Sequence, residues 1–526
     1  MPIHRPRTGA GGPLRRTVPV ALIAAAALLA GCSTTAERPS ASAGTGTAAQ
    51  DGGTLRYVIA GSPATAGNDP HGGLANESDA LRFALLYDVL TVPGDDGRAK
   101  PRLAESWQPD STLTRWTLRL RTGATFTDGR PVRAADVLYS LRRIERKAAE
   151  NYGRLAQFDT QASTAPDDHT VVLVSRAPNA LVPEALESVT FVVPEGSDDF
   201  TKPVPGSGPY LLDSMDGQTA VVKRNPGWWG ERPRLDAIEI RAVADPQARA
   251  AAVAAGQADV AGSVNPAAAK SSGAGVRVVR RPAVTEYPFV MRLDRKPFDD
   301  PRVREAFKLA TDRQALVDTV FLGFGRIAND LPTPYDPSYP KDLAQRPRDL
   351  DRAKKLLAEA GHADGLRVTL HTTTSYPGMD TAAALYARQL ADIGVTVTVS
   401  NDPPDTYFTT VWGKADFYTG YFGGIPFTDV ARVALMSASP TNETAWKRPA
   451  WDAAFTEALA VGDDATRNER LGALQKELWK DGGYVVWGLG DGLDLTSPSV
   501  RGLPTGPGFQ RLFLDTVRLA APGATG

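Results

Sequence analysis

The sequence predicts an α/β protein with mixed sheets flanked by helices, and three observations lead to this fold class. Segments with strand patterning and segments with helical spacing alternate in both halves of the chain. The strand-like segments are short and often bounded by glycine or proline. Hydrophobic residues make up 42% of the 526 residues and charged residues 23%, which is ordinary for a soluble protein with large cores.

The first half of the folded part opens with a strand. Residues 52–61 alternate between apolar and polar side chains and are flanked by glycines. A helix is expected at 77–90, where apolar residues recur at helical spacing. Residues 114–146 predict strand, turn, strand, turn and a helix that begins near Ala134. Further along we expect strands at 169–175 and 189–196, a hairpin within 206–230 and a strand–helix–strand unit over 235–264.

The second half alternates in the same way. We expect helices at 301–321, 349–361 and 379–394, with strands at 366–372 and 395–400. The apolar stripes of these helices are most simply explained by core packing, so we assign them no chemistry.

The N-terminus predicts export. Residues 1–16 are basic, and the apolar run that follows them is shorter than the about 20 residues that span a bilayer. A basic segment, a short apolar segment and small residues at the end are typical of a signal peptide, here residues 1–31. Arg15 and Arg16 leave open whether export follows the Sec or the twin-arginine route.

The only cysteine of the chain, Cys32, follows this run directly, and Leu29-Ala30-Gly31-Cys32 resembles the bacterial lipobox. Lipidation of Cys32 is therefore expected. Residues 32–51 contain no large apolar residue and predict a flexible tether that reaches roughly 25 Å. The protein is expected to be exported and lipid-anchored to the outer face of the bacterial cytoplasmic membrane, without disulfides.

Composition and motifs argue against several function classes. The formal net charge is −1 with both signs interspersed, which predicts neither nucleic-acid binding nor a polybasic membrane patch. The lipid is therefore the only membrane attachment expected. Nucleophile-elbow, phosphate-loop and HExxH signatures are absent, and we expect no metal, no cofactor and no enzymatic activity. The five histidines are scattered, and His71, which follows Asp69-Pro70, is interpreted as a turn residue.

Several blocks occur together in a fixed order. The chain opens with "GGTLRYVIAGSPATAGNDPH", followed by "LAESW" and "FTDGRP" within residues 86–144. Later blocks are "GSGPYLL", "KRNPGWWGERPRLDAIEIR", "PFDDPRVREAFKLATDRQALVD" and "AKKLLAEAG". From Gly52 to about Leu519 the sequence resembles extracellular solute-binding protein family 5, the peptide- and nickel-type receptors of ABC importers.

This resemblance implies a bilobal, type II periplasmic-binding-protein-like fold with an extra domain and a ligand cleft between the lobes. Domain I would comprise residues 52–76, 191–281 and 490–523, domain II residues 77–190 and domain III residues 282–489. The implied function is to capture a peptide or peptide-like solute as a monomer and deliver it to an ABC permease and its ATPase. Two alternatives stay open: a secreted hydrolase that acts in the cleft, and a sensor or adhesion lipoprotein without a role in transport.

The resemblance also implies which segments line the cleft. The stretch 72–76 contributes Leu74 and Asn76, and the stretch 415–430 contributes Tyr421 and Phe422, where members often place aromatic side chains. Peptide-binding members commonly carry an aspartate just beyond, which pairs with the ligand's ammonium.

That aspartate corresponds to Gly424 in this chain, and Asp429 either replaces it or caps a loop. The third implied segment, 285–300, contributes Tyr287 and Arg292. Arg292 either binds a carboxylate or phosphate of the ligand or belongs to an ion pair. Tyr287 lines the cleft or packs in the core.

Overall fold

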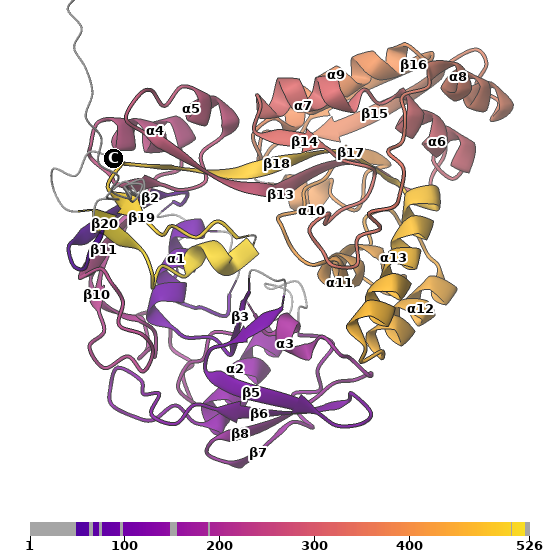
Figure 1. Ribbon diagram of the computed structural model, residues 1–526. Helices are drawn as coiled ribbons and strands as arrows, with labels where there is room; N and C mark the ends of the chain where they lie inside the picture. Colours follow the sequence, from indigo (N-terminus) through magenta and orange to yellow (C-terminus); the bar gives the residue numbers. More distant parts are fainter. Residues whose placement is uncertain are drawn as a thin grey trace, which may run out of the picture. The chain divides into compact units, whose positions relative to one another are not determined.

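A large mixed sheet organises the part of the chain that the structure describes (Figure 1). The computed structural model describes residues 49–62, 67–72, 76–94, 98–147, 155–187, 190–404, 406–506 and 508–520, all within the compact unit Thr47–Gly526. The predicted signal peptide, Cys32 and nearly all of the tether lie outside the described residues. No helix in the described ranges is long and apolar enough to cross a lipid bilayer.

The strand order of the large sheet is β16-β15-β17-β13-β18-β12-β2-β11-β10-β9, and β14 pairs with β18. Strand β2 pairs in parallel with β11 and β12, and β15 with β16, whereas β9, β10 and β11 form antiparallel pairs. The predicted mixed sheet is thus confirmed. The bounds are β2 Thr54–Ile59, β9 Tyr210–Asp216, β10 Thr219–Arg224, β11 Ala237–Ala242, β12 Val260–Ala261, β13 Arg277–Met291, β14 Gly325–Ile327, β15 Leu366–Thr372, β16 Val395–Asn401, β17 Phe417–Thr419 and β18 Tyr484–Thr496.

Two long antiparallel strands, β13 and β18, join the two ends of this sheet and run side by side in Figure 1. Their pairing extends from Arg277 opposite Thr496 to Val290 opposite Tyr484, with irregular register after Arg281 and after Glu286. Gly490 of β18 allows the ring of Phe321 to lie against the strand, because a Cβ atom there would come within 2.7 Å of the ring.

Smaller antiparallel sheets accompany the large one. Helix α2 (Ala134–Arg146) begins one residue after Arg133, and its apolar face joins a core with the β5-β6-β8-β7 sheet. The strands of this sheet are β5 Ala104–Pro109, β6 Arg115–Leu120, β7 Thr164–Asp167 and β8 Thr170–Val174. A second small sheet pairs β3 Thr91–Pro93 with β4 Ala99–Pro101. In a third, β20 Arg518–Ala520 lies between β1 Ala49–Gln50 and β19 Val500–Arg501.

Many helices begin at an aspartate or asparagine whose side chain accepts a hydrogen bond from the first turn, as expected for an N-cap. The bounds of the remaining helices are α1 Glu77–Leu86, α3 Val182–Ala185, α4 Pro246–Ala254, α5 Pro266–Lys270, α6 Pro301–Ala310, α7 Arg313–Phe321, α8 Leu350–Glu359, α9 Met379–Ala391, α10 Tyr407–Thr410, α11 Phe427–Val430, α12 Pro449–Leu459, α13 Asp464–Asp481, the π-helix η2 Ala431–Leu435 and the 3-10 helix η3 Gly508–Leu512.

Three predicted elements differ from the structure. The helix expected at 301–321 is two helices, because Asp312 caps α7 by accepting from the Ala315 N–H. The strand expected at 189–196 does not form in its described part: the Val192 N–H donates to the Asp88 carbonyl and the Val193 N–H to Ser140 Oγ, so no ladder develops. The second strand within 114–146 is reduced to a single bridge near residue 125.

The tryptophans of the "PGWWG" block fix the chain next to α1. The indole Nε1–H groups of Trp228 and Trp229 both donate to Asp88, at 3.3 and 3.0 Å. Asp88 is fully buried and also accepts from Arg102 at 2.7 Å, and Arg102 reaches Asp515 at 2.6 Å. The block therefore links segments far apart in the sequence through a buried network of ion pairs and hydrogen bonds.

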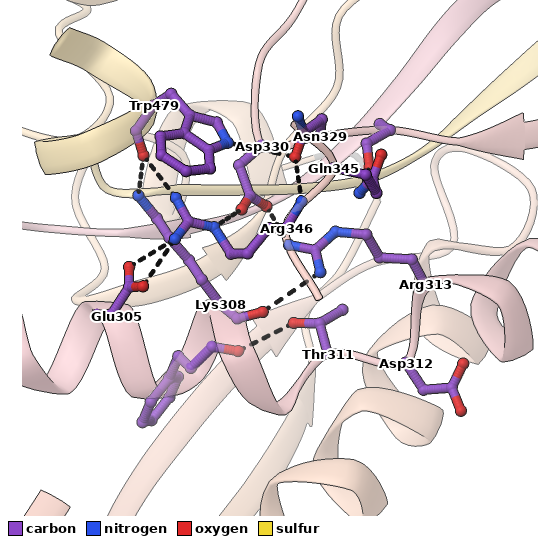
Figure 2. Close-up of polar contacts among 12 residues, drawn as sticks. Glu305, Lys308, Thr311, Asp312, Arg313, Asn329, Asp330, Gln345, Arg346 and Trp479 are labelled. Atoms are coloured by element: carbon purple, nitrogen blue, oxygen red, sulfur yellow. Dashed lines mark hydrogen bonds and ion pairs between the residues drawn. The ribbon is translucent and has the colours of Figure 1, made fainter. Parts of the chain in front are cut away.

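A buried charged network lies where α6 meets the chain before α8 (Figure 2). Asp330 accepts from Arg313 at 2.6 Å and from Arg346 at 2.7 Å, and Arg346 also bonds both oxygens of Glu305. The positive charges of Arg313 and Arg346 thus balance the negative charges of Asp330 and Glu305. Lys308, which is 1% exposed, is the surplus cation, and burial lowers its pKa to about 7.

Candidate ligand-binding site

A cavity of about 710 Å³ lies between two segments that are far apart in the sequence. One wall comes from residues 156–157 and 176–179, and the other from residues 425–459. Sites that bind small molecules typically measure about 300–1,000 Å³. A second hollow, beside Asp79 and Arg82, holds about 100 Å³ and is too small for a peptide.

The second wall is built on the chain that leaves β17. Strand β17 pairs with β13, and Gly420 follows at a close approach, since a Cβ atom there would lie 2.9 Å from Pro288. Phe422 and Glu286 then exchange two backbone hydrogen bonds of 3.0 Å. Gly424, which the resemblance matches to the aspartate of peptide-binding members, has φ +66°, a left-handed conformation that favours glycine.

Helix α11 and the π-helix η2 present one face to the cavity. Asp429, Arg432, Val433 and Met436 all line it, at intervals of three, four and seven residues. The Phe427 N–H donates to Asp336 at 2.9 Å, which fixes the start of α11. π-helical turns are rare and frequently occur at functional sites, so this face is a candidate ligand contact.

Two opposite charges on this face are only loosely paired. Nη1 of Arg432 lies 3.5 Å from Oδ1 of Asp429, and the side chains are 20% and 32% exposed. Burial lowers the pKa of Arg432. Among the described residues neither side chain has another hydrogen-bond or ion-pair partner, so both keep bonding capacity for a ligand.

A second acidic group, Glu187, follows helix α3. Burial, together with the negative charges of Glu184 and Asp429, raises the pKa of Glu187 to about 8. The carboxylate of Asp429 itself lies 3.5 Å from the guanidinium of Arg432.

The first wall carries an arginine that is already occupied. Arg176 donates to Glu145 at 2.9 Å and to the Ala156 carbonyl at 3.2 Å. A backbone hydrogen bond of 2.8 Å from the Ala180 N–H to the Leu459 carbonyl joins the two walls at their base. The ligand-facing charge of the cavity is thus concentrated on α11 and η2.

Tyr421 lies further back along the same chain, in a group of tyrosines. Its ring stacks on Tyr376 at 3.8 Å between centroids and with an interplanar angle of 9°, and Tyr287 lies 6.0 Å away. Burial and the negative charge of Glu77 raise the pKa of Tyr421 to about 12. Glu77 is the first residue of α1 and accepts hydrogen bonds from Arg511 and Ser263.

The structure places the other predicted site residues in local contacts. Tyr287 is buried in a hydrophobic cluster and donates its hydroxyl to the Pro377 carbonyl, and Phe422 is buried against Tyr484. Arg292 pairs with Asp294 and bonds the Gly413 carbonyl. This ion pair is one of the two alternatives that the sequence left open.

Asn76 immediately precedes α1, where it donates to the Ser62 carbonyl and accepts from Ser78. Leu74 lies outside the described residues. Of the predicted residues, the structure brings Tyr421 and Tyr287 together and puts Asp429 on the cavity wall. Within the described ranges, no group of three or more His, Cys, Asp or Glu side chains could hold a metal ion.

Sequence reasoning missed Arg432, Glu187 and Glu286. The Asp429-x-x-Arg432 spacing indicates a charged helical face. Nothing in the sequence indicates that the charge of Asp429 acts on Glu187. Glu286 is fully buried: its Oε1 accepts from the Thr333 N–H at 2.8 Å, its Oε2 has no partner among the described residues, and burial raises its pKa to about 8.

The comparisons with known proteins agree on one family. The model of the bacterial extracellular solute-binding proteins, family 5 (Middle), matches residues 98–444. The glutathione-binding protein GsiB of Shigella boydii is 28% identical over 441 residues, covering 79% of this chain and 85% of the relative. GsiB of Salmonella typhimurium is 27% identical over 443 residues, with the same coverage.

Solved structures share the fold at lower identity. DppA of Helicobacter pylori, in complex with the peptide STSA, has a TM-score of 0.76 at 21% identity and covers 90% of this chain and 99% of its own. CtaP of Listeria monocytogenes has a TM-score of 0.78 at 20% identity, and AppA of Bacillus subtilis, in complex with a nonapeptide, 0.74 at 20%; each covers 90% of this chain and 100% of its own.

These matches confirm the α/β periplasmic-binding-protein-like fold and the expectation of a binding protein rather than an enzyme. The family model covers well over half of the chain. The chain therefore belongs to the bacterial extracellular solute-binding proteins of family 5.

Proposed function

We propose that this protein captures a peptide or peptide-like solute in the cavity between residues 156–179 and 425–459 and delivers it to an ABC permease. The observation that carries the proposal is the cavity itself, about 710 Å³ in volume, with a loosely paired Asp429 and Arg432 on its wall. Its size suits a small peptide, and its few polar groups could fix the ligand's orientation. Relatives named as glutathione-binding and structural neighbours in complex with peptides support this choice.

Asp429, which lines the cavity, is proposed as a ligand contact, and Tyr421, four residues before Ile425 of the same wall, as a contact for a solute that extends beyond the cavity. Tyr421 offers a half-buried ring, held in place by its stacking on Tyr376, and Asp429 offers a carboxylate. Tyr287 and Phe422 are buried in hydrophobic clusters and are not among the residues that line the cavity, so neither is proposed to touch the solute. Aromatic stacking with a ligand gains from such rigid support because little side-chain entropy is lost on binding.

Strands β13 and β18 are proposed as the hinge between the predicted domains. They continue from the part of the sheet around β2 and β12 to the part around β17, and their pairing is irregular near Arg281 and Glu286. The ion pair of Arg281 and Asp494 is buried at this crossing. Few backbone positions need to change for a hinge to close around a ligand, and the ligand stabilises the closed state through contacts to both sides.

The N-terminal segment is proposed to export the protein and to anchor it through a lipid on Cys32. A tether of residues 32–51 would then keep the receptor within reach of its permease. A soluble receptor would diffuse away in an organism without an outer membrane, so the anchor and the transport role fit one another.

Native mass spectrometry of protein lacking residues 1–51 tests the proposed function. The protein is measured after gentle purification and again after denaturation and refolding, and then with added peptides that have free or blocked ends. A mass excess that disappears on refolding, or a rise of the melting temperature with a peptide, is the expected result. If no peptide or peptide-like compound binds in either measurement, the proposal is wrong.

A further inference from the structure

Strand β13 is tied to two other segments of the chain by Glu286. Its backbone exchanges two hydrogen bonds of 3.0 Å with Phe422, and its Oε1 accepts from the Thr333 N–H at 2.8 Å. The register of β13 against β18 shifts directly after Glu286, so the ladder is interrupted where these contacts form. Thr333 has φ +56°, a left-handed conformation that a β-branched residue adopts at a cost, and its hydrogen bond to Glu286 helps to hold it there.

The segment 333–336 is in turn bonded to the start of the cavity wall. The Tyr335 hydroxyl donates to the Ile425 carbonyl at 3.0 Å, and Asp336 accepts from the Phe427 N–H at 2.9 Å, where α11 begins. Ile425 and residues further along α11 and η2 line the cavity. We call Glu286, residues 333–336 and residues 422–427 the joint. Through the joint, one side chain of β13 helps to fix where the wall begins.

The carboxyl group at the centre of the joint is buried. Glu286 and Thr333 are both fully buried, and Oε2 of Glu286 and Oγ1 of Thr333 have no hydrogen-bond partner among the described residues. A neutral carboxyl is tolerated in such a place, whereas a carboxylate would lose most of its hydration. Burial accordingly raises the pKa of Glu286 to about 8.

The ionisable groups linked electrostatically to Glu286 offer it no positive charge. They are three tyrosines and two aspartates: Tyr335, Tyr339, Tyr421, Asp336 and Asp429. Arg326 of β14 lies across β18 from Glu286, but its side chain is exposed. The charged form of Glu286 is therefore disfavoured as long as the joint stays closed, and it is favoured once water can enter.

We propose that Glu286 is a positioning residue for the cavity wall: its neutral carboxyl keeps the joint closed, and its ionisation opens the joint and releases the wall. This role rests on the proposed function, since it takes the cavity as the solute site. A carboxylate can accept hydrogen bonds on both oxygens, and the closed joint provides the Thr333 N–H for one of them. Water reaches the other oxygen when the contacts to residues 333–336 or to Phe422 separate. The receptor thus holds its wall most firmly in mildly acidic surroundings.

Hydrogen exchange of the purified protein, measured by mass spectrometry between pH 5.5 and pH 7.5, tests the proposal without any solute. Labelling times are scaled to the intrinsic exchange rate at each pH, so that only the opening equilibrium is compared. Opening lets Glu286 release its proton, so the protection of residues 333–336 and 422–427 should fall about tenfold for each pH unit in this range. These amides should also be less protected than those of β15 and α9, because the joint opens locally.

Three substitutions assign the effect. Glu286→Gln keeps a neutral side chain of the same shape and should make the protection of the joint independent of pH. Glu443→Gln is the matched control, because Glu443 is 1% exposed and has a pKa raised by burial to about 7, but it accepts from Trp412 at 2.7 Å rather than from the joint. The pH dependence of the joint should survive in it. Tyr335→Phe removes the hydrogen bond to Ile425 and should lower protection about fivefold at every pH.

Several outcomes would overturn the proposal. Protection of the joint that does not vary with pH in the parent would do so without any variant, and so would a dependence that persists in Glu286→Gln. Loss of the dependence in Glu443→Gln would mean that a different carboxylate controls the wall. If Glu286→Gln does not fold, the profiles of the parent and of Glu443→Gln still decide between the two carboxylates.

Equal protection of the joint and of β15 and α9 would also refute the role of Glu286, because only global unfolding would then expose it. All of these measurements are made without solute. Failure of the joint therefore leaves the proposed function standing, and that function is tested separately by whether a peptide or peptide-like compound binds.

Discussion

Replacing Lys308 by methionine should stabilise the protein at neutral pH. The side chain of Lys308 is 1% exposed, and its Nζ donates to the Trp479 carbonyl at 3.0 Å. The neighbouring carboxylates of Asp330 and Glu305 are already balanced by two guanidinium groups (Figure 2). A charged Lys308 therefore has no counter-ion of its own, and methionine keeps the length of the apolar stem without the charge.

The size of the expected stabilisation follows from the pKa of Lys308, which burial lowers from 10.5 to about 7. At about 1.4 kcal/mol for each tenfold change in proton affinity, and with the folded group half protonated at pH 7, folding costs about 4 kcal/mol more than it would with a neutral side chain. Losing the hydrogen bond to Trp479 offsets about 1 kcal/mol. That carbonyl stays satisfied, because Nη2 of Arg346 also donates to it at 3.0 Å. The net expectation is a gain of about 3–4 kcal/mol.

The sign of the pH dependence gives a second check. Between pH 7 and pH 10.5 the unfolded chain holds the Lys308 proton and the folded chain does not, so the stability of the unmodified protein rises with pH in this window. The advantage of Lys308→Met should therefore shrink to about 1 kcal/mol at pH 9.

Urea unfolding followed by tryptophan fluorescence at pH 7 and pH 9 measures both effects. Lys355→Met, at a lysine that is 77% exposed, is the matched control and should change stability by less than about 0.5 kcal/mol. A Lys308→Met variant that is less stable than the parent at pH 7, or an advantage that does not depend on pH, would refute the reasoning.

Three further predictions concern the fold, the anchor and the site. The buried Glu286, with its pKa raised to about 8, contributes stability that is present below pH 4.5 and lost as the pH rises through 8. The melting temperature of Glu286→Gln should therefore exceed that of the parent by a difference that grows between pH 5 and pH 9. A difference that is the same at every pH would contradict this. Cys32→Ser should release the protein from membranes, as fractionation and immunoblotting would detect; continued membrane retention argues against the lipid anchor. Tyr421→Ala should weaken solute binding at least tenfold with a small change in melting temperature, whereas Phe422→Ala should cost about 3 kcal/mol of stability because that ring is buried. Unchanged affinity in Tyr421→Ala would remove Tyr421 from the site.

Local sequence signals predicted most of the elements correctly. The alternation in residues 52–61, the hairpin within 206–230 and the helix at 379–394 all form near the expected bounds. Each depends on the periodicity of neighbouring side chains or on a turn, which are properties of a short segment. The errors at 189–196 and at Asp312 arose where a tertiary hydrogen bond or a cap replaced the pattern that the segment alone suggested.

The roles of individual site residues were harder to predict. Asp429 could be singled out from its position in the resemblance, but its partner Arg432 gained meaning only from the cavity that both face. Arg292 illustrates the opposite case, since a guanidinium that could have bound a ligand is paired with Asp294, two residues away. A side chain's type shows what it can bind, and its neighbours decide what it does bind.

The sequence by itself determined the α/β class and the order of the elements, and it predicts a signal peptide over residues 1–31, because these depend on local composition and spacing. Only the tertiary structure decided that residues 156–179 and 425–459 enclose a cavity and that the negative charge of Asp429 helps to raise the pKa of Glu187, more than two hundred residues away. The physical reason is that cavities and pKa shifts arise from burial by distant segments, and a local pattern carries no record of which segment will supply that burial.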